Sequence, residues 1–264
     1  MNRIDKTFKI LRRAGKKAFI AYITAGDPSL AATEKLVLAL EKSGADIIEL
    51  GIPFSDPLAD GPTIQAASLR ALKAGASLKK IFKLVSVIRK KSDIPIVFMT
   101  YYNPVFKYGV ANFFKNSRLC GVDGVIIPDL PTEEAGEVIK FGKKNRISTI
   151  FLAAPTSTRK RIIDITRKSS GFIYYVSLTG VTGARKKLPA ELKSKVRLIK
   201  SLTDKPVAVG FGVSSAANAK QVAKAADGVI VGSAIVKIIG EKRDYINRVS
   251  GFVKVLAKAV HDKR

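Results

Sequence analysis

Two carboxylates, Glu49 and Asp60, occupy positions where acid–base chemistry could use them. The segment D-I-I-E-L-G-I-P-F-S-D-P-L-A-D-G-P (46–62) places Glu49 inside an apolar run and Asp60 in the turn that follows. Burying an unpaired carboxylate costs free energy or raises its pKa, so a purely structural strand has little use for one. The alternative is a glutamate paired with a basic residue, but no neighbouring apolar run contains one. The pattern predicts Glu49 as a catalytic residue and leaves Asp60 as a second candidate carboxylate.

Other catalytic chemistries lack the side chains that they need. The chain has one cysteine, Cys120, and one histidine, His261. A single cysteine excludes an internal disulfide framework and a cysteine-rich metal site. His261 lies in the charged C-terminal tail, where we expect a solvated surface residue. Carboxylate chemistry without a metal is therefore the prediction.

Three glycine-rich turns near the C-terminus form a second candidate site. They read T-G-V-T-G-A (179–184), G-F-G-V-S-S (210–215) and V-G-S-A (231–234), and each precedes a helix-like segment. Glycine lets the backbone approach an anion closely, and the N–H groups at a helix start can bind it. The last two strands of α/β barrels often carry a phosphate site of this kind. The turns predict a small phosphorylated substrate.

Short apolar runs must position these groups, and they alternate with longer helical patterns. Eight such runs begin near Ala18, Asp46, Ile94, Val122, Ile147, Phe172, Lys205 and Asp227. Most starts are 22 to 33 residues apart, the length of one strand with one crossover helix. The step between the second and third runs is 48 residues and contains two helical stretches, 63–74 and 78–90.

This order predicts an α/β fold, a (β/α)8 TIM barrel formed by residues 1–264 as one domain, with an extra helical segment after strand 2. A doubly wound open sheet is the alternative, although it usually has fewer strands at this length. Ile4, Phe8 and Leu11 recur at helical spacing, which predicts an N-terminal helix that plugs the bottom of the barrel. Strand alternation turns Ile48 and Leu50 toward the helices and Glu49 into the barrel.

The charge balance is unusually basic. The 47 Lys and Arg residues outnumber 21 Asp and Glu, which gives a net charge of +26. No run of five cations occurs, so solvated helix faces are favoured over a nucleic-acid site, and a positive field would attract a phosphorylated substrate. Lys16-Lys17 precedes a short apolar run without a cleavage-site pattern. We therefore expect no secretion signal, and no run approaches the length of a membrane span.

The run E-L-G-I-P-F-S-D-P-L-A-D-G (49–61) resembles the signature of tryptophan synthase alpha subunits. The resemblance extends to A-Y-I-T-A-G-D-P (21–28), to V-D-G-V-I-I-P-D-L-P (122–131) and to the three glycine turns, so it covers essentially the whole chain. Tyr22 departs from the phenylalanine of that family, and the high positive charge is also atypical of it.

The resemblance implies a lyase of tryptophan biosynthesis that cleaves indole-3-glycerol phosphate reversibly to indole and glyceraldehyde 3-phosphate. It implies that Glu49 transfers protons and that Asp60 faces the indole nitrogen. We expect the Thr182 hydroxyl to reach Asp60 once the loop after Gly183 closes over the substrate. The implied indole pocket and phosphate contacts are Tyr22, Ile64, Tyr101 and Tyr174, and Gly183, Gly212, Gly232 and Ser233.

The resemblance also implies a partner. This is a beta subunit, in a cytoplasmic tetramer of two alpha and two beta subunits, that contacts Pro53 and Asp56. No cofactor is expected on this chain, and pyridoxal phosphate is expected only on the beta subunit. Two other functions stay open: another phosphate-binding barrel enzyme, such as a sugar-phosphate aldolase or isomerase, and a non-catalytic basic barrel that binds RNA. No lysine lies within an apolar strand core, which disfavours a Schiff-base aldolase.

Overall fold

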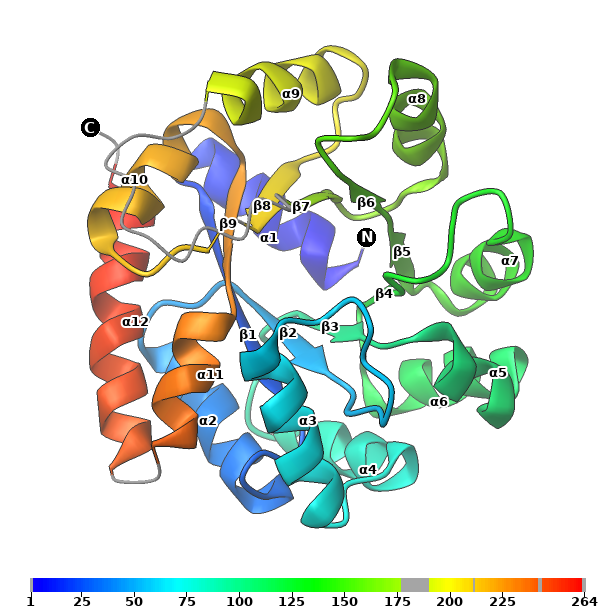
Figure 1. The fold of residues 1–264 in the computed structure, drawn as a ribbon, viewed down its shortest axis with the longest axis vertical. Helices are drawn as coiled ribbons and strands as arrows, with labels where there is room; N and C mark the ends of the chain where they lie inside the picture. The colour runs from blue at the N-terminus through cyan, green and yellow to red at the C-terminus, as the bar shows by residue number, and fades with distance from the viewer. Residues whose placement is uncertain (1, 177–189, 211, 242–243, 263–264) are drawn as a thin grey trace.

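A closed parallel sheet organises the molecule (Figure 1). The computed structural model describes residues 2–176, 190–210, 212–241 and 244–262. The strands in this part of the chain are β1 (Ala18–Thr24), β2 (Ile47–Gly51), β3 (Ile96–Met99), β4 (Gly124–Ile126), β5 (Ser148–Ile150), β6 (Leu152–Ala153), β7 (Ile173–Val176), β8 (Val207–Gly210) and β9 (Gly228–Val231).

The order of these strands makes the sheet a barrel. The order is β5-β4-β3-β2-β1-β9-β8-β7-β6, and the pairs are parallel throughout. The two terminal strands of that order, β5 and β6, are separated in sequence by Phe151 alone. They are two pieces of one strand, so the sheet closes on itself. The predicted eight-stranded barrel is confirmed, and every strand begins within two residues of its predicted start.

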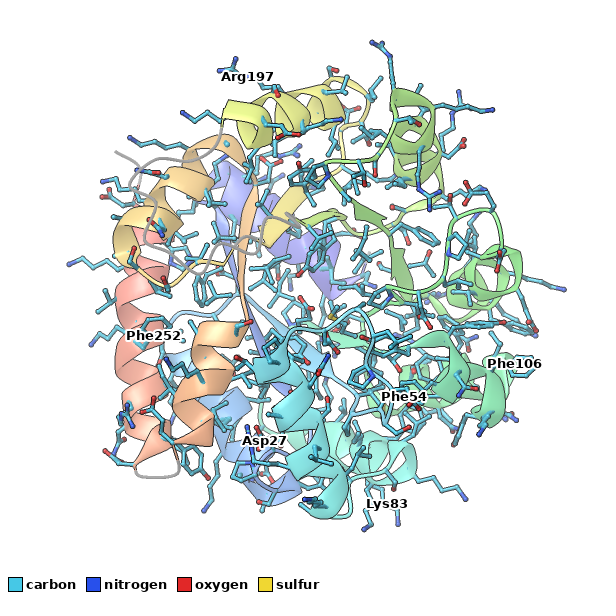
Figure 2. All side chains as sticks on the ribbon, viewed as in Figure 1. Asp27, Phe54, Lys83, Phe106, Arg197 and Phe252 are labelled. Atoms are coloured by element: carbon cyan, nitrogen blue, oxygen red, sulfur yellow. The ribbon has the colours of Figure 1, made fainter. Side chains whose placement is uncertain are left out.

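The apolar composition of the strands follows from their burial on both faces. Ile48, Leu50 and Phe98 belong to the core between the sheet and the surrounding helices. Ile47 and Val97, which alternate with them, belong to a second core inside the barrel. Figure 1 shows the helices arranged around the strands. Exposed charged side chains cover the outer faces of the helices, and Figure 2 labels Lys83 and Arg197 among them.

The predicted plug is helix α1 (Arg3–Arg13), which lies across the end of the barrel where the strands begin. Its buried Ile4, Phe8 and Leu11 pack into the inner core. The Asn2 side chain accepts a hydrogen bond from the Ile4 N–H (2.9 Å) and donates one to the Asp123 carbonyl (2.6 Å). The start of the chain is thus fixed to the residue before β4.

The remaining helices are α2 (Leu30–Lys42), α3 (Pro62–Lys73), α4 (Leu78–Arg89), α5 (Tyr102–Tyr108), α6 (Val110–Cys120), α7 (Gly136–Asn145), α8 (Arg159–Lys168), α9 (Ala190–Ser201), α10 (Ala216–Ala225), α11 (Ser233–Gly240) and α12 (Tyr245–His261). Helices α3 and α4 confirm the extra helical segment after β2. Two further helix pairs were not predicted, α5 with α6 and α11 with α12. The first pair is divided at Gly109, whose φ of +86° favours glycine. No helix in the described part of the chain is long and apolar enough to cross a membrane.

His261, the single histidine, differs from the solvated residue expected at the C-terminus. It is half-buried at the end of α12, and its Nε2 lies 2.8 Å from Asp46 Oδ2. The same carboxylate oxygen accepts a hydrogen bond from the Phe19 N–H (2.7 Å). The end of helix α12 therefore lies beside the starts of strands β1 and β2. The sequence does not indicate this contact, because the residues are far apart in the chain.

Candidate active site

Glu49 lies in the middle of β2 and points into the barrel. Its neighbours Ile48 and Leu50 face the helices, as strand alternation predicts. The Glu49 side chain is 1% exposed, and its Oε2 has no hydrogen-bond partner. Burial, with a smaller contribution from the negative charge of Asp60, raises the Glu49 pKa to about 8. At neutral pH this carboxylic acid therefore holds a proton that it can donate.

Asp60 ends the loop between β2 and α3 and is half-buried. The Tyr101 hydroxyl donates to its Oδ2 (3.1 Å), and the same hydroxyl accepts the Ala59 N–H (2.9 Å). Gln65, one turn into α3, donates to the Asp60 carbonyl (2.8 Å). Burial raises the Asp60 pKa, and the Tyr101 hydrogen bond opposes that rise. The two carboxylates thus have different environments, which is how one site can hold an acid and a charge-stabilising group.

Helix α3 is held in place by an ion pair in its last turn. Arg70 of α3 forms two hydrogen bonds, of 2.8 and 2.7 Å, with the carboxylate of Asp27 in the loop after β1. Asp27 is buried, and paired geometry of this kind fixes orientation as well as distance. The ion pair therefore joins the loop after β1 to helix α3, and this fixes the helix that follows Asp60.

The predicted pocket residues lie around this carboxylate pair. Tyr22 of β1 and Ile64 of α3 share a buried cluster, and Tyr101 follows β3 directly. Tyr174 of β7 is buried in the inner core. Burial and the negative charge of the site raise the pKa of the Tyr22 and Tyr174 hydroxyls far above the usual range, so both stay neutral. Neutral phenols line the site on strands β1 and β7.

Three cluster members were missed in the sequence: Ala67, Met99 and Val236. Met99 is the last residue of β3 and alternates with the inward Val97, a pattern that could have identified it. Ala67 and Val236 lie on α3 and α11, and no motif indicates that these two helices pack together. Their contact is a tertiary feature, which a single sequence does not reveal.

The described glycine turns lie on neighbouring strands. Gly210 and Ile230 are paired across β8 and β9, so Gly212 and Gly232 each follow the pair by two residues at the same edge. A Cβ on Gly212 would meet nothing within 4 Å, and its φ of +29° favours glycine. Gly232 caps α11, and the exposed Ser233 begins that helix. Thr182 and Gly183, predicted with them, lie outside the described residues.

The loop after β2 also carries the residues predicted to contact a partner. Asp56 is exposed and accepts a hydrogen bond from the Ser55 hydroxyl (2.7 Å). Leu58 in the same loop is 93% exposed, which is unusual for a large apolar side chain. Pro53 is buried beneath them. The part of this loop that a partner could contact therefore begins at Ser55.

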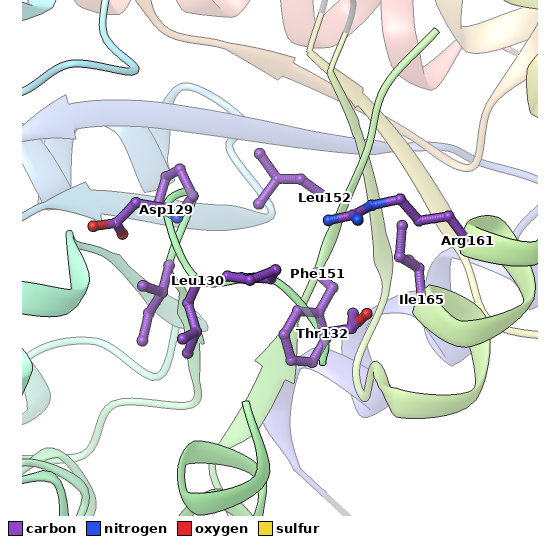
Figure 3. Close-up of a pocket in the computed structure, with 10 residues that line it drawn as sticks. Asp129, Leu130, Thr132, Phe151, Leu152, Arg161 and Ile165 are labelled. Atoms are coloured by element: carbon purple, nitrogen blue, oxygen red, sulfur yellow. The ribbon is translucent and has the colours of Figure 1, made fainter. Parts of the chain in front are cut away.

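A cavity of about 260 Å³ lies apart from the carboxylates, between the segment after β4 and helix α8 (Figure 3). None of the predicted site residues lines it. Arg161 extends over it, whereas the Asp129 carboxylate points away and accepts the Tyr102 N–H (2.9 Å). No group of three or more His, Cys, Asp or Glu side chains in the described part of the chain could hold a metal ion.

Fold and site together define a class: a parallel α/β barrel with a buried glutamate and a half-buried aspartate near the carboxyl ends of its strands, where barrel enzymes act. The family model described as tryptophan synthase alpha chain matches residues 8–263. The chain belongs to the tryptophan synthase alpha chain family.

Individual relatives agree with that assignment. The chain is 55% identical over 241 residues to the tryptophan synthase alpha chain of Caldanaerobacter subterraneus, covering 91% of this chain and 92% of the relative. It is 49% identical to that of Thermoanaerobacter sp. strain X514, covering 98% and 100%.

Solved structures give the same result for the fold. The tryptophan synthase subunit alpha of Legionella pneumophila matches with a TM-score of 0.92 at 39% identity, covering 98% of each chain. A chain of Mycobacterium tuberculosis tryptophan synthase matches with a TM-score of 0.92 at 38% identity, covering 99% of each. The resemblance read from residues 49–61 is therefore confirmed.

Proposed function

We propose that this chain is a carbon–carbon lyase of tryptophan biosynthesis that cleaves indole-3-glycerol phosphate reversibly to indole and glyceraldehyde 3-phosphate. Its family membership supports this function. The observation that carries the chemistry is Glu49, a carboxylic acid with a pKa of about 8 and an unpartnered oxygen inside the barrel.

The reaction gives each carboxylate a separate task. Glu49 donates its proton to carbon 3 of the indole ring, and the ring nitrogen becomes positively charged. Asp60 stabilises that charge as a carboxylate held by Tyr101. The bond from carbon 3 to the side chain then breaks, and its electron pair neutralises the ring. The side-chain hydroxyl becomes the aldehyde and loses its proton, which the ionised Glu49 can accept.

The substrate would bridge two groups of residues in this proposal. Tyr22, Ile64, Tyr101 and Tyr174 would hold the indole ring. Gly183, Gly212, Gly232 and Ser233 would hold the phosphate, since N–H groups at the starts of helices bind anions. Thr182 would act near Asp60. This chemistry requires no cofactor on the chain.

The partner in this proposal is a tryptophan synthase beta subunit, which would consume the indole in a cytoplasmic tetramer of two alpha and two beta subunits and would carry pyridoxal phosphate itself. The loop with Pro53 and Asp56 would contact it, because Asp56 and Leu58 are exposed beside the loop's own carboxylate Asp60.

The direct test is to mix the purified chain with indole-3-glycerol phosphate and to measure free indole. Glu49→Gln should lower the rate by about 10²–10⁴ or more, the usual range for losing a general acid. Glu137→Gln makes the same chemical change at an exposed position on α7 and should keep the rate. No indole from the parent, or more than about half the parent rate in Glu49→Gln, would refute the proposal.

A further inference from the structure

Two inward-facing tyrosines lie directly over glycines at the ends of neighbouring strands. The Tyr22 hydroxyl of β1 occupies the place where a Cβ on Gly51 of β2 would stand. The Tyr174 hydroxyl of β7 lies 2.7 Å from the place of a Cβ on Gly210 of β8. Any other residue at these strand ends would displace a phenol. The missing side chains therefore make room for the two hydroxyls.

The Tyr22 side chain lies between two glycines. Its Cβ and Cδ1 lie 3.4 Å from the place where a Cβ on Gly232 would stand, so the base of the side chain lies beside the turn proposed to bind phosphate. Its hydroxyl lies against Gly51, two residues beyond Glu49 on the same face of β2. The ring thus spans the site from the turn proposed to bind phosphate to the carboxylate side.

The Tyr22 hydroxyl has a weak hydrogen bond to compensate for its burial. Thr24 Oγ1 lies 3.4 Å away, near the limit for such a bond. The side chain is 7% exposed, and the nearby carboxylate of Asp60 disfavours ionisation of the hydroxyl. The hydroxyl therefore faces the carboxylates. We expect its volume to affect the fit of the substrate more than its weak hydrogen bond does.

We propose that the Tyr22 hydroxyl is a specificity determinant that limits the size of the indole ring on the β1–β2 side of the pocket. The inference rests on the proposed function for the identity of the ring. Ile64, Ala67, Val236 and Met99 pack around Tyr22, so the wall cannot yield easily to a substituent. Removing the oxygen leaves a space over Gly51 that a small group on the ring can fill.

The test compares indole with its 4-, 5-, 6- and 7-methyl derivatives in condensation with glyceraldehyde 3-phosphate. The readout is kcat/KM for each methylindole divided by kcat/KM for indole, which cancels any general loss of activity. Discrimination of one methyl group usually amounts to about 10- to 200-fold. Tyr22→Phe should raise this ratio at least about tenfold for one or more isomers.

Tyr174→Phe is the matched control, because it removes the same atom from the other glycine-seated phenol. It should favour a different isomer or none. A rise below tenfold for every isomer in Tyr22→Phe overturns the proposal, and so does the same set of gains in both variants, which would indicate general loosening. If the parent chain does not condense indole at all, the proposed function fails. In that case the ratio of the binding constants of each methylindole and indole, measured at equilibrium, still tests the size limit.

Discussion

At the scale of single residues, the burial that prepares Glu49 to donate a proton also lowers the stability of the folded chain at high pH. Its pKa is raised from the usual 4.5 to about 8 in the folded chain, because burial penalises the ionised form. Between these pH values the folded protein binds a proton that the unfolded chain has released. Stability must therefore fall as pH rises through this window, and the loss is complete above about pH 8.

Glu49→Gln should remove this pH-dependent loss. The variant and the parent should have similar unfolding free energies near pH 4. Relative to the parent, the variant should become more stable as pH rises, by up to about 5 kcal/mol above pH 8. Urea unfolding at pH 5, 7 and 9 measures this, with Glu137→Gln as the exposed control. Parallel stability curves for parent and Glu49→Gln would contradict the raised pKa.

The sequence predicts the inward position of Glu49 but only some of the contacts around it. Alternation along residues 47–51 is enough to turn Glu49 inward, because both faces of the strand are buried. The hydrogen bond from Tyr101 to Asp60 spans 41 residues and depends on how the loop after β2 folds over β3. The pairing of His261 with Asp46 spans 215 residues. Contacts of this range follow from the closed barrel and have no local signal.

At the scale of elements, the turn after β8 should determine how phosphate binds. A side chain at Gly212 would project into open space, where the phosphate is proposed to lie, and would strain the backbone at a φ of +29°. Gly212→Val should weaken binding of glycerol 3-phosphate at least about tenfold, or 1.4 kcal/mol. Binding of free indole should change less than about twofold, which titration calorimetry can measure.

Gly136→Val provides the control for that substitution. Gly136 also has nothing within 4 Å of its Cβ position, but it begins the outer helix α7. This variant should bind both ligands as the parent does. An equal loss of glycerol 3-phosphate and indole binding in Gly212→Val would instead assign the turn a structural role.

Elements differed in how well the sequence predicted them. The strands were located within two residues because they are continuous apolar runs between turns. The paired helices α5 and α11 have only 7 and 8 residues, about two turns each, which is too short for a clear helical period. The break at Phe151 that divides β5 from β6 has no signal in the sequence, since no glycine or proline lies between Ser148 and Ala153.

At the scale of the whole molecule, the charge of +26 should make stability depend on salt. Like charges repel most strongly in the compact state, and the screening length falls from about 30 Å at 10 mM salt to about 10 Å at 100 mM. The melting temperature should therefore rise over that range, and the KM for indole-3-glycerol phosphate should rise with it. A falling melting temperature would mean that the surface ion pairs outweigh the repulsion.

Assembly gives a second prediction at this scale, through the exposed loop after β2. Titrating a beta subunit into the chain should raise the rate of indole-3-glycerol phosphate cleavage, because ordering of this loop acts on Asp60. Asp56→Ala should reduce that increase. Asp5→Ala, at the plugged end of the barrel, should leave it intact. An unchanged rate at saturating beta subunit would exclude this coupling.

Closure of the barrel also affects the chain while it is being made. Strand β1 pairs with β2 on one side and with β9 on the other. About 200 residues separate β1 from β9, which at about 5–20 residues per second is roughly 10–40 s of translation. Throughout that interval one edge of a strand that is entirely buried in the finished fold has no native partner. The closed sheet leaves no free strand edge in the finished enzyme. During synthesis, however, the edge of β1 is exposed on the ribosome, within reach of a chaperone or of another nascent chain.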